Sequence, residues 1–172
     1  MSCHEHLPNL AVPAGAKKIV LAGNPNVGKS VFFNAFTGKY VDVSNFPGTT
    51  VDITHGRFGQ DVVLDTPGVY GISSFNDEER VARDVILTAD IVVNIVNAVH
   101  LERDLFLTLQ IIDTGLPVIV ALNMMDEAQR QGMKIDVDRL EDLLGVPVIP
   151  AVAVKGRGIE ELKQRVYEAR PG

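Results

Sequence analysis

The segment that most constrains the fold is 23–30, which reads GNPNVGKS, fits the pattern GxxxxGK[ST] and directly follows an apolar run at 19–22. Glycines let consecutive backbone N–H groups turn inward around an anion. A helix that starts near Lys29 directs the positive end of its dipole at the same anion. The segment therefore predicts a strand, a phosphate-binding loop and a helix in direct succession.

Short runs rich in Val and Ile alternate with helical patterns along the rest of the chain. Residues 54–58 are expected to return as a hairpin with 62–65. Runs that are apolar on both faces are typical of buried parallel strands, so this order predicts a doubly wound α/β domain. We expect a mostly parallel six-stranded sheet with one antiparallel edge hairpin and helices on both faces. The expected strands are 19–23, 62–65, 90–96, 117–123 and 146–153, and the expected helices are 29–37, 77–87, 102–114, 137–144 and 159–169.

Composition sets the broad class of the protein. The 172 residues suffice for one domain, which we expect at 17–170 after a loosely held tail at 1–16. The single cysteine excludes an internal disulfide, and the net charge of −6 gives no general electrostatic reason to bind nucleic acid or anionic lipid. The longest apolar runs fall short of the roughly 18 residues that span a bilayer. These features predict a soluble domain in a reducing, cytoplasmic setting with no nucleic-acid partner, while a homo-oligomer stays open.

Several residues suit a magnesium triphosphate. Lys29 can reach the β- and γ-phosphates as a point charge, and the motif positions the Ser30 hydroxyl to coordinate Mg²⁺. Asp65 ends an apolar strand and begins the sequence DTPG. We expect Asp65 to hold Mg²⁺ through water, and the Gly68 N–H to sense the γ-phosphate. Taken alone, each motif also has a plain alternative, a glycine-rich turn with an exposed lysine or a simple DTPG turn.

Two segments have the composition of loops that order only with the triphosphate. The loop at 40–50 contains NFPGTT, where one threonine should coordinate Mg²⁺ when the γ-phosphate is present, as switch loops do. We expect this ligand to be Thr50, with Thr49 as the alternative. The segment at 68–76 is rich in small and polar residues, which also suits a mobile piece.

Residues 123–126 read NMMD, and this NxxD pattern resembles the guanine-binding element of the GTPase superfamily. The Asp126 carboxylate can accept hydrogen bonds from the ring N–H and the exocyclic amine of guanine, an arrangement that adenine lacks. Capping of a helix N-terminus by Asp126 is an alternative that can coexist. The last base-contacting loop departs from the serine-alanine-lysine element of these GTPases. We align Val152 with serine and Ala153 with alanine, so that the Ala153 N–H would meet guanine O6 and Lys155 falls one residue past the usual lysine.

Asn26 is the candidate ligand of a catalytic cation. Val69 stands where Ras-like enzymes carry the glutamine that orients the attacking water, and an apolar side chain cannot direct a water molecule. Asn26 occupies the position that resembles the potassium-binding asparagine of cation-activated GTPases such as MnmE. A K⁺ ion held there would supply the positive charge of an arginine finger. The alternative is that Asn26 only braces the loop.

The expected site combines these groups. Catalysis is expected to involve Asn26, Lys29, Thr50 and Gly68. Mg²⁺ is expected at Ser30, Thr50 and Asp65, and K⁺ at Asn26. The residues expected to contact GTP or GDP are Asn24, Pro25, Asn26, Val27, Gly28, Lys29, Ser30, Val31, Asn123, Met124, Asp126, Val152, Ala153 and Val154.

Longer stretches resemble one family. The sequences NFPGTTV, DTPGVY, NMMDEA and VAVKG, together with the phosphate-loop motif, look like the GTPase domain of the ferrous iron transport protein FeoB over about residues 17–170. One departure is Asn97, where FeoB-like sequences usually have aspartate. The resemblance implies a GTPase domain on the cytoplasmic side of a bacterial inner membrane, joined to a helical coupling domain and a permease for Fe²⁺. From Val69 and Asn26 we expect slow intrinsic turnover that is faster in K⁺ than in Na⁺. We expect this chain to lack both of those parts.

Three other functions stay open. A ribosome-assembly GTPase of the Era or Der kind would share the nucleotide chemistry but adds an RNA-binding module, and nothing basic follows Arg170. A P-loop ATPase or kinase would leave Asn123 and Asp126 unexplained. A non-catalytic switch would bind GTP with negligible hydrolysis. The cluster CHEH at 3–6 resembles no structural zinc pattern, and we expect only adventitious metal affinity there.

Overall fold

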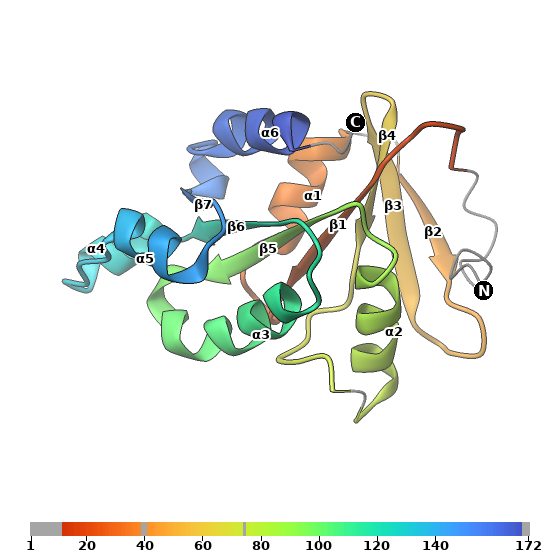
Figure 1. Ribbon diagram of the computed structural model, residues 1–172, viewed down its shortest axis with the longest axis horizontal. Helices are drawn as coiled ribbons and strands as arrows, with labels where there is room; N and C mark the ends of the chain where they lie inside the picture. The colour runs from red at the N-terminus through yellow and green to blue at the C-terminus, as the bar shows by residue number, and fades with distance from the viewer. Residues whose placement is uncertain (1–11, 39–40, 74, 170–172) are drawn as a thin grey trace.

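The computed structural model describes residues 12–38, 41–73 and 75–169. Within these ranges, seven strands form one sheet in the order β2-β3-β4-β1-β5-β6-β7 (Figure 1). The pairs formed by β1 with β4 and β5, by β5 with β6 and by β6 with β7 are parallel, while β3 pairs antiparallel with β2 and β4. The strands are β1 (Lys18–Gly23), β2 (Val41–Asn45), β3 (Asp52–Phe58), β4 (Asp61–Asp65), β5 (Ile91–Asn97), β6 (Val118–Asn123) and β7 (Val148–Pro150).

Helices cover both faces of the sheet (Figure 1). α1 (Lys29–Thr37) and α6 (Ile159–Glu168) pack on one face. The other face carries α2 (Asp77–Ile86), α3 (Leu101–Asp113), α4 (Met125–Arg130) and α5 (Val137–Leu144). Short 3₁₀ turns, η2 (Ala98–His100) and η3 (Ala153–Lys155), follow β5 and β7. None of the helices in the described ranges is both long and apolar enough to cross a bilayer.

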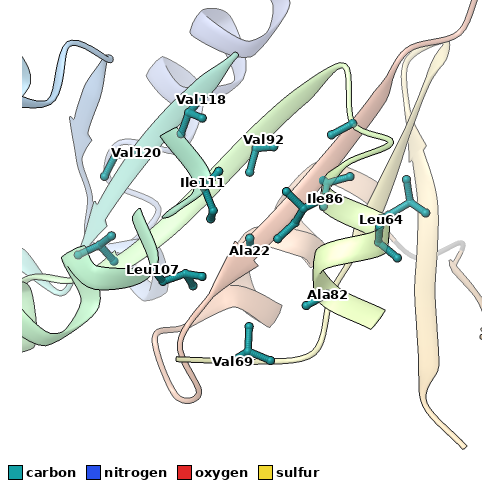
Figure 2. Close-up of a cluster of buried hydrophobic side chains, with 14 of the residues drawn as sticks. Ala22, Leu64, Val69, Ala82, Ile86, Val92, Leu107, Ile111, Val118 and Val120 are labelled. Carbon is teal, nitrogen blue, oxygen red and sulfur yellow. The ribbon is translucent and has the colours of Figure 1, made fainter. Parts of the chain in front are cut away.

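The core has two layers because successive side chains of a strand point to opposite faces. In β1, Ile19 and Leu21 join the layer under α1 and α6, whereas Val20 and Ala22 join the layer under α2 and α3. Figure 2 shows the second layer, in which strand residues such as Val92 and Leu64 meet side chains of α2 and α3. Burial on both faces explains why the central strands are continuous apolar runs.

The predicted α/β class with helices on both faces is confirmed, but the predicted strand number was one too low. Residues 41–45, assigned from the sequence to a loop, form β2 and pair with β3 from Val41 opposite Gly56 to Asn45 opposite Asp52. Val43 is 61% exposed, so this edge strand is held by its backbone hydrogen bonds and carries little apolar signal. The first eleven residues of the predicted tail, with the CHEH cluster, lie outside the described residues.

Candidate functional site

The predicted site residues gather at the edge of the sheet where the parallel strands end. β1 leads into the loop at 24–28, β4 ends at Asp65 and β6 ends at Asn123. β3 runs antiparallel to β4, with Thr54 opposite Asp65, so the turn before β3 lies at the same edge. The carboxyl ends of parallel strands form the usual ligand crevice of such sheets. The topology therefore brings four separate parts of the chain to one place.

The loop at 24–28 has a backbone that few residues adopt at low cost. Asn26 and Gly28 have left-handed φ angles of 64° and 88°, a region that asparagine and glycine tolerate. A Cβ atom at Gly28 would lie 2.6 Å from Asn123 Nδ2. α1 begins directly after Gly28, which has no side chain to cap the first N–H groups of the helix. The loop thus presents backbone donors at a helix N-terminus, which suits an anion.

The side chains of this loop and of the first turn of α1 point in different directions. Asn26 and Ser30 are exposed. Val27 is buried in the core layer under α1, and Val31 packs against the same layer. Residues 27 and 31 can therefore serve a ligand only through their backbone or by holding the loop in shape.

Lys29 is directed at the end of β4. Its ammonium group pairs with the Asp65 carboxylate and donates to the Thr66 carbonyl oxygen at 2.6 Å. Burial raises the pKa of Asp65, and the positive charge of Lys29 offsets part of this rise. The structure brings together the lysine and the acid that the two motifs predicted, in a partly buried ion pair.

The DTPG segment is docked on the phosphate loop. The Thr66 hydroxyl donates to Leu21 O at 2.8 Å, and the Val69 N–H donates to Gly23 O at 3.1 Å. A Cβ atom at Gly68 would lie 2.9 Å from Pro25 Cα, so glycine is the residue that permits this approach. Val69 is 4% exposed and belongs to the core (Figure 2). Packing accounts for the valine that stands in the glutamine position.

The two threonines of the turn before β3 differ in their contacts. The Thr49 hydroxyl donates to Phe46 O at 2.9 Å and accepts from the Val51 N–H at 3.1 Å. It therefore helps to shape the turn. Thr50 is exposed at the same edge of the sheet as Asp65.

Asn123 joins the two halves of the site. Its side chain is buried, with Nδ2 donating to Val27 O at 3.0 Å and Oδ1 accepting from the Ala153 N–H at 3.0 Å. One amide therefore connects the phosphate loop to the loop after β7. Met124, the next residue, has a left-handed φ of 62° and starts the turn into α4.

The predicted alignment of the loop after β7 was wrong by one residue. The Ala153 N–H is engaged by Asn123, so it does not face a base. The Lys155 ammonium lies 3.5 Å from the Asp126 carboxylate. An alignment with Ala153 at serine, Val154 at alanine and Lys155 at lysine accounts for both contacts. Sequence alone misplaced the loop because the contacts that set the alignment, from Asn123 to Ala153 and from Asp126 to Lys155, join residues that are distant in the chain.

Asp126 is in the first turn of α4 and does not cap that helix, whose N-cap residue is Met124. Its carboxylate accepts from the Glu127 N–H at 2.9 Å and lies 3.7 Å from the Arg130 guanidinium. Partial desolvation raises the pKa of Asp126, but the Glu127 hydrogen bond and the charges of Arg130 and Lys155 outweigh it, so the net shift is downward. Asp126 is therefore an ionised acceptor at neutral pH.

A buried polar cluster behind the phosphate loop was missed by the sequence reasoning. The Asp104 side chain on α3 is 1% exposed and accepts from Asn24 Nδ2 at 3.0 Å and from the Asn97 N–H at 2.9 Å. The signal was available, because Asp104 falls on the same helix face as the core residues Leu107 and Ile111. An acid at a core position needs partners, and here two of them come from the ends of β1 and β5.

Two surface hollows lie near the site, one lined in part by Arg103 and the other in part by Asp126. One of about 680 Å³ is lined by the start of α3, the segment 133–136 and α5. Another of about 520 Å³ is lined by α4, the segment 132–135, Val152 and Arg157. Neither has the phosphate loop in its lining. Within the described ranges, no three His, Cys, Asp or Glu side chains are grouped so that they could hold a metal ion.

Comparison with known proteins gives the family. The family model described as ferrous iron transport protein B matches residues 17–166. The chain belongs to the FeoB family. It is 45% identical over 155 residues to the Fe(2+) transporter FeoB of Salmonella typhimurium and 44% identical over 155 residues to that of Escherichia coli K12. Each alignment covers 84% of this chain and 20% of the relative. The chain thus spans about a fifth of the length of these curated FeoB relatives.

Solved FeoB G-domains have the same fold. An S. thermophilus NFeoB mutant bound to mGDP matches with a TM-score of 0.83 at 44% identity, over 87% of this chain and 59% of that one. The G domain of the T. maritima FeoB iron transporter matches with a TM-score of 0.81 at 37% identity, over 91% of this chain and 99% of that one. This chain is therefore a FeoB G-domain, as its sequence motifs predicted.

Proposed function

We propose that this chain binds GTP with Mg²⁺ and hydrolyses it to GDP and phosphate. One observation carries the proposal: the Asn123 amide joins Val27 of the phosphate loop to Ala153 of the loop beside Asp126. A loop suited to polyphosphate and an acid suited to guanine are thereby held in one frame. FeoB relatives bound to GDP and mGDP support the same ligand class.

The phosphate end of the site has the donors that Mg²⁺ prefers. Ser30 and Thr50 offer hydroxyl oxygens and Asp65 a carboxylate, all at one edge of the sheet. Bound Mg²⁺ would neutralise charge on the triphosphate. The backbone N–H groups of 26–30 and the Lys29 ammonium would hold the phosphate oxygens. Because Lys29 pairs with Asp65, we infer that this ion pair opens when phosphate replaces the carboxylate as the partner of the ammonium.

The base end follows from the corrected alignment. The Asp126 carboxylate would accept from the two guanine N–H positions, and the Val154 N–H would donate to guanine O6. Val154 is 80% exposed, which suits a backbone donor at a ligand site. Lys155, close to Asp126, would cover the base with its aliphatic stem. Met124 and Val152 would hold this region by packing.

Hydrolysis requires a group that orients the attacking water. Val69 is buried, so that position does not supply one. We propose that K⁺ held at Asn26 places positive charge on the phosphates, and that the Gly68 N–H contacts the γ-phosphate. Intrinsic turnover is then slow and faster in K⁺ than in Na⁺.

The longer protein would be a transporter. The curated relatives are described as Fe(2+) transporters and extend far beyond this segment. We propose that this domain lies on the cytoplasmic side of a bacterial inner membrane, where GTP hydrolysis gates or regulates Fe²⁺ uptake through a helical coupling domain and a permease. Assembly into a homo-oligomer is compatible with this function.

The base assignment is tested by Asp126→Asn. An amide donates where the carboxylate accepts, so it should favour xanthine, which has a carbonyl in place of the guanine amine. We expect GTP affinity to fall about 100-fold and xanthosine triphosphate affinity to rise. Asp138→Asn, at an exposed position of α5, is the matched control. Equal wild-type affinity for GTP and ATP would refute the guanine assignment, and GTP binding without hydrolysis in K⁺ would indicate a non-catalytic switch.

The cation assignment is tested with Asn26→Ala. Single-turnover hydrolysis should be faster in K⁺ than in Na⁺ or Li⁺ for the wild type, and this difference should disappear in the variant. Equal rates in all three salts, with Asn26→Ala as fast as wild type, would contradict it.

A further inference from the structure

Helix α3 contacts two parts of the nucleotide site through different side chains. Its inner face holds the phosphate loop, because Asp104 accepts from Asn24 Nδ2 at 3.0 Å. Its outer face holds the segment that follows Gly68, where Gln110 Oε1 accepts from the Ile72 N–H at 2.9 Å. α3 therefore contacts both the phosphate loop and the segment 70–72.

Asp104 uses both of its carboxylate oxygens. Oδ2 accepts from the Asn97 N–H at 2.9 Å, which anchors the side chain to the end of β5. Oδ1 accepts from Asn24 Nδ2 at 3.0 Å and from Arg103 Nε at 3.0 Å. Asn24 and Arg103 thus share one oxygen atom, so the position of one donor affects the position of the other.

Arg103 continues this connection to the surface. Its guanidinium carbon lies 5.5 Å from the centre of the Tyr70 ring, within the range of a cation–π contact. Tyr70 is the second residue after Gly68. Gly71 completes the contact, since a Cβ atom there would lie 3.0 Å from Gln110 Oε1 and 3.4 Å from Phe106 Cε1. Residues 70–72 therefore rest directly on α3.

We propose that Asp104 is a positioning residue that couples the phosphate loop, through Arg103, to the segment 70–72. The proposal rests on the proposed GTPase function and adds to it the route by which nucleotide in the loop affects the segment after Gly68. A shift of Asn24 when phosphate binds changes its hydrogen bond to Oδ1 and so changes how Arg103 is held against Tyr70. Asp104 acts through Asn24 and Arg103 and touches no reacting atom.

Charge and burial distinguish this carboxylate from an ordinary surface acid. A buried carboxylate is stable only with well-placed donors, and the donors here come from the loop after β1, the end of β5 and α3 itself. Asp84 on α2 provides the contrast, since it also pairs with the preceding arginine, Arg83, at 3.2 Å, but its side chain is 41% exposed. Asp84→Asn is therefore a matched control with the same chemical change and no contact with the phosphate loop.

The test uses a tryptophan in place of Tyr70. The 172-residue sequence has no tryptophan, so Tyr70→Trp gives one fluorescence signal at the end of the proposed connection. In this background we compare three variants, Asp104→Asn, Arg103→Ala and Asp84→Asn. For each we measure GDP affinity, and kcat and KM for GTP per mole of folded protein. We also record the tryptophan emission with GDP and with a non-hydrolysable GTP analogue.

We expect Asp104→Asn to lower GDP affinity about tenfold, because an amide has one acceptor oxygen where the carboxylate has two, so it cannot accept from both Asn24 Nδ2 and the Asn97 N–H. The same change should remove the emission difference between the two nucleotides. Arg103→Ala should remove the emission difference while GDP affinity stays within about twofold, and Asp84→Asn should change neither. If Asp104→Asn lowers only the melting temperature, with affinity, kcat and emission unchanged, the residue is merely structural and the proposal fails. If the parent protein with Tyr70→Trp alone binds no guanine nucleotide, the proposed GTPase function itself fails.

Discussion

Truncation of Asn123 is the sharpest test of how this site is held together. In Asn123→Ala, Val27 O loses its donor and the Ala153 N–H loses its acceptor, both in a region where Asn123 itself is 3% exposed. Each unsatisfied buried group costs about 1–3 kcal/mol. With about 1.5 kcal/mol for each, the variant should lose about 3 kcal/mol of unfolding free energy, which for a chain of this size lowers the melting temperature by roughly 6–12 °C.

The assay is thermal unfolding followed by circular dichroism, paired with titration of a fluorescent GDP analogue. Because the amide joins the phosphate loop to the base loop, we expect GDP affinity to fall at least about tenfold among the molecules that remain folded. Asn123→Asp keeps the acceptor for Ala153 but opposes an oxygen to Val27 O, so it should lose affinity as well. Asn34→Ala on the exposed face of α1 is the control, and its stability should change by only about 0.5 kcal/mol.

The reasoning would be refuted if Asn123→Ala unfolded within 1 °C of the wild type and bound GDP equally well. That result would mean that the two loops hold their positions without the amide. A loss of affinity without a loss of stability would instead restrict the role of Asn123 to the bound state.

Three further predictions concern the phosphate end and the edge hairpin. Gly68→Ala should reduce GTP hydrolysis about tenfold with little change in GDP affinity. The added Cβ atom would lie 2.9 Å from Pro25 Cα and would push the DTPG segment off the phosphate loop, so unchanged single-turnover rates would contradict this prediction. Burial raises the pKa of Asp65, so Mg²⁺-dependent nucleotide binding should weaken as pH falls through that raised pKa. Binding titrations from about pH 4 to 7 should show this transition in the wild type and not in Asp65→Asn. Burial lowers the pKa of His55 below the usual histidine value, and the charge of Asp42 opposes this shift. The unfolded chain then binds the proton more readily, so stability is lost as pH falls through the usual histidine range. The stability of His55→Gln, measured by unfolding at several pH values, should lack this dependence.

The sequence predicted most of the candidate nucleotide site because its signals are local. The pattern at 23–30 specifies a strand, a loop and a helix, and the structure places α1 directly after Gly28. The pairing of Lys29 with Asp65 joins two motifs that the sequence identified independently. Buried parallel strands have continuous apolar runs, which is why β1, β5 and β6 were found close to their observed bounds.

The misses share a different cause, which is that their determinants are far apart in the chain. β2 is an exposed edge strand, so its existence depends on pairing with β3 and not on its own composition. The alignment of the loop after β7 was decided by Asn123, thirty residues away. The role of Asp104 required knowledge that α3 lies beside Asn24, eighty residues earlier.

What the sequence by itself determined is which chemical groups are available and the local backbone that presents them, because glycine conformation, strand burial and helix starts depend on neighbouring residues. What only the tertiary structure decided is which of those groups meet. Val69 became a core residue, Ala153 N–H a partner of Asn123, and Asp104 the link between α3 and the phosphate loop. The physical reason is that a buried polar group takes whichever partner the packing of distant elements places within reach, and no short-range pattern records that choice.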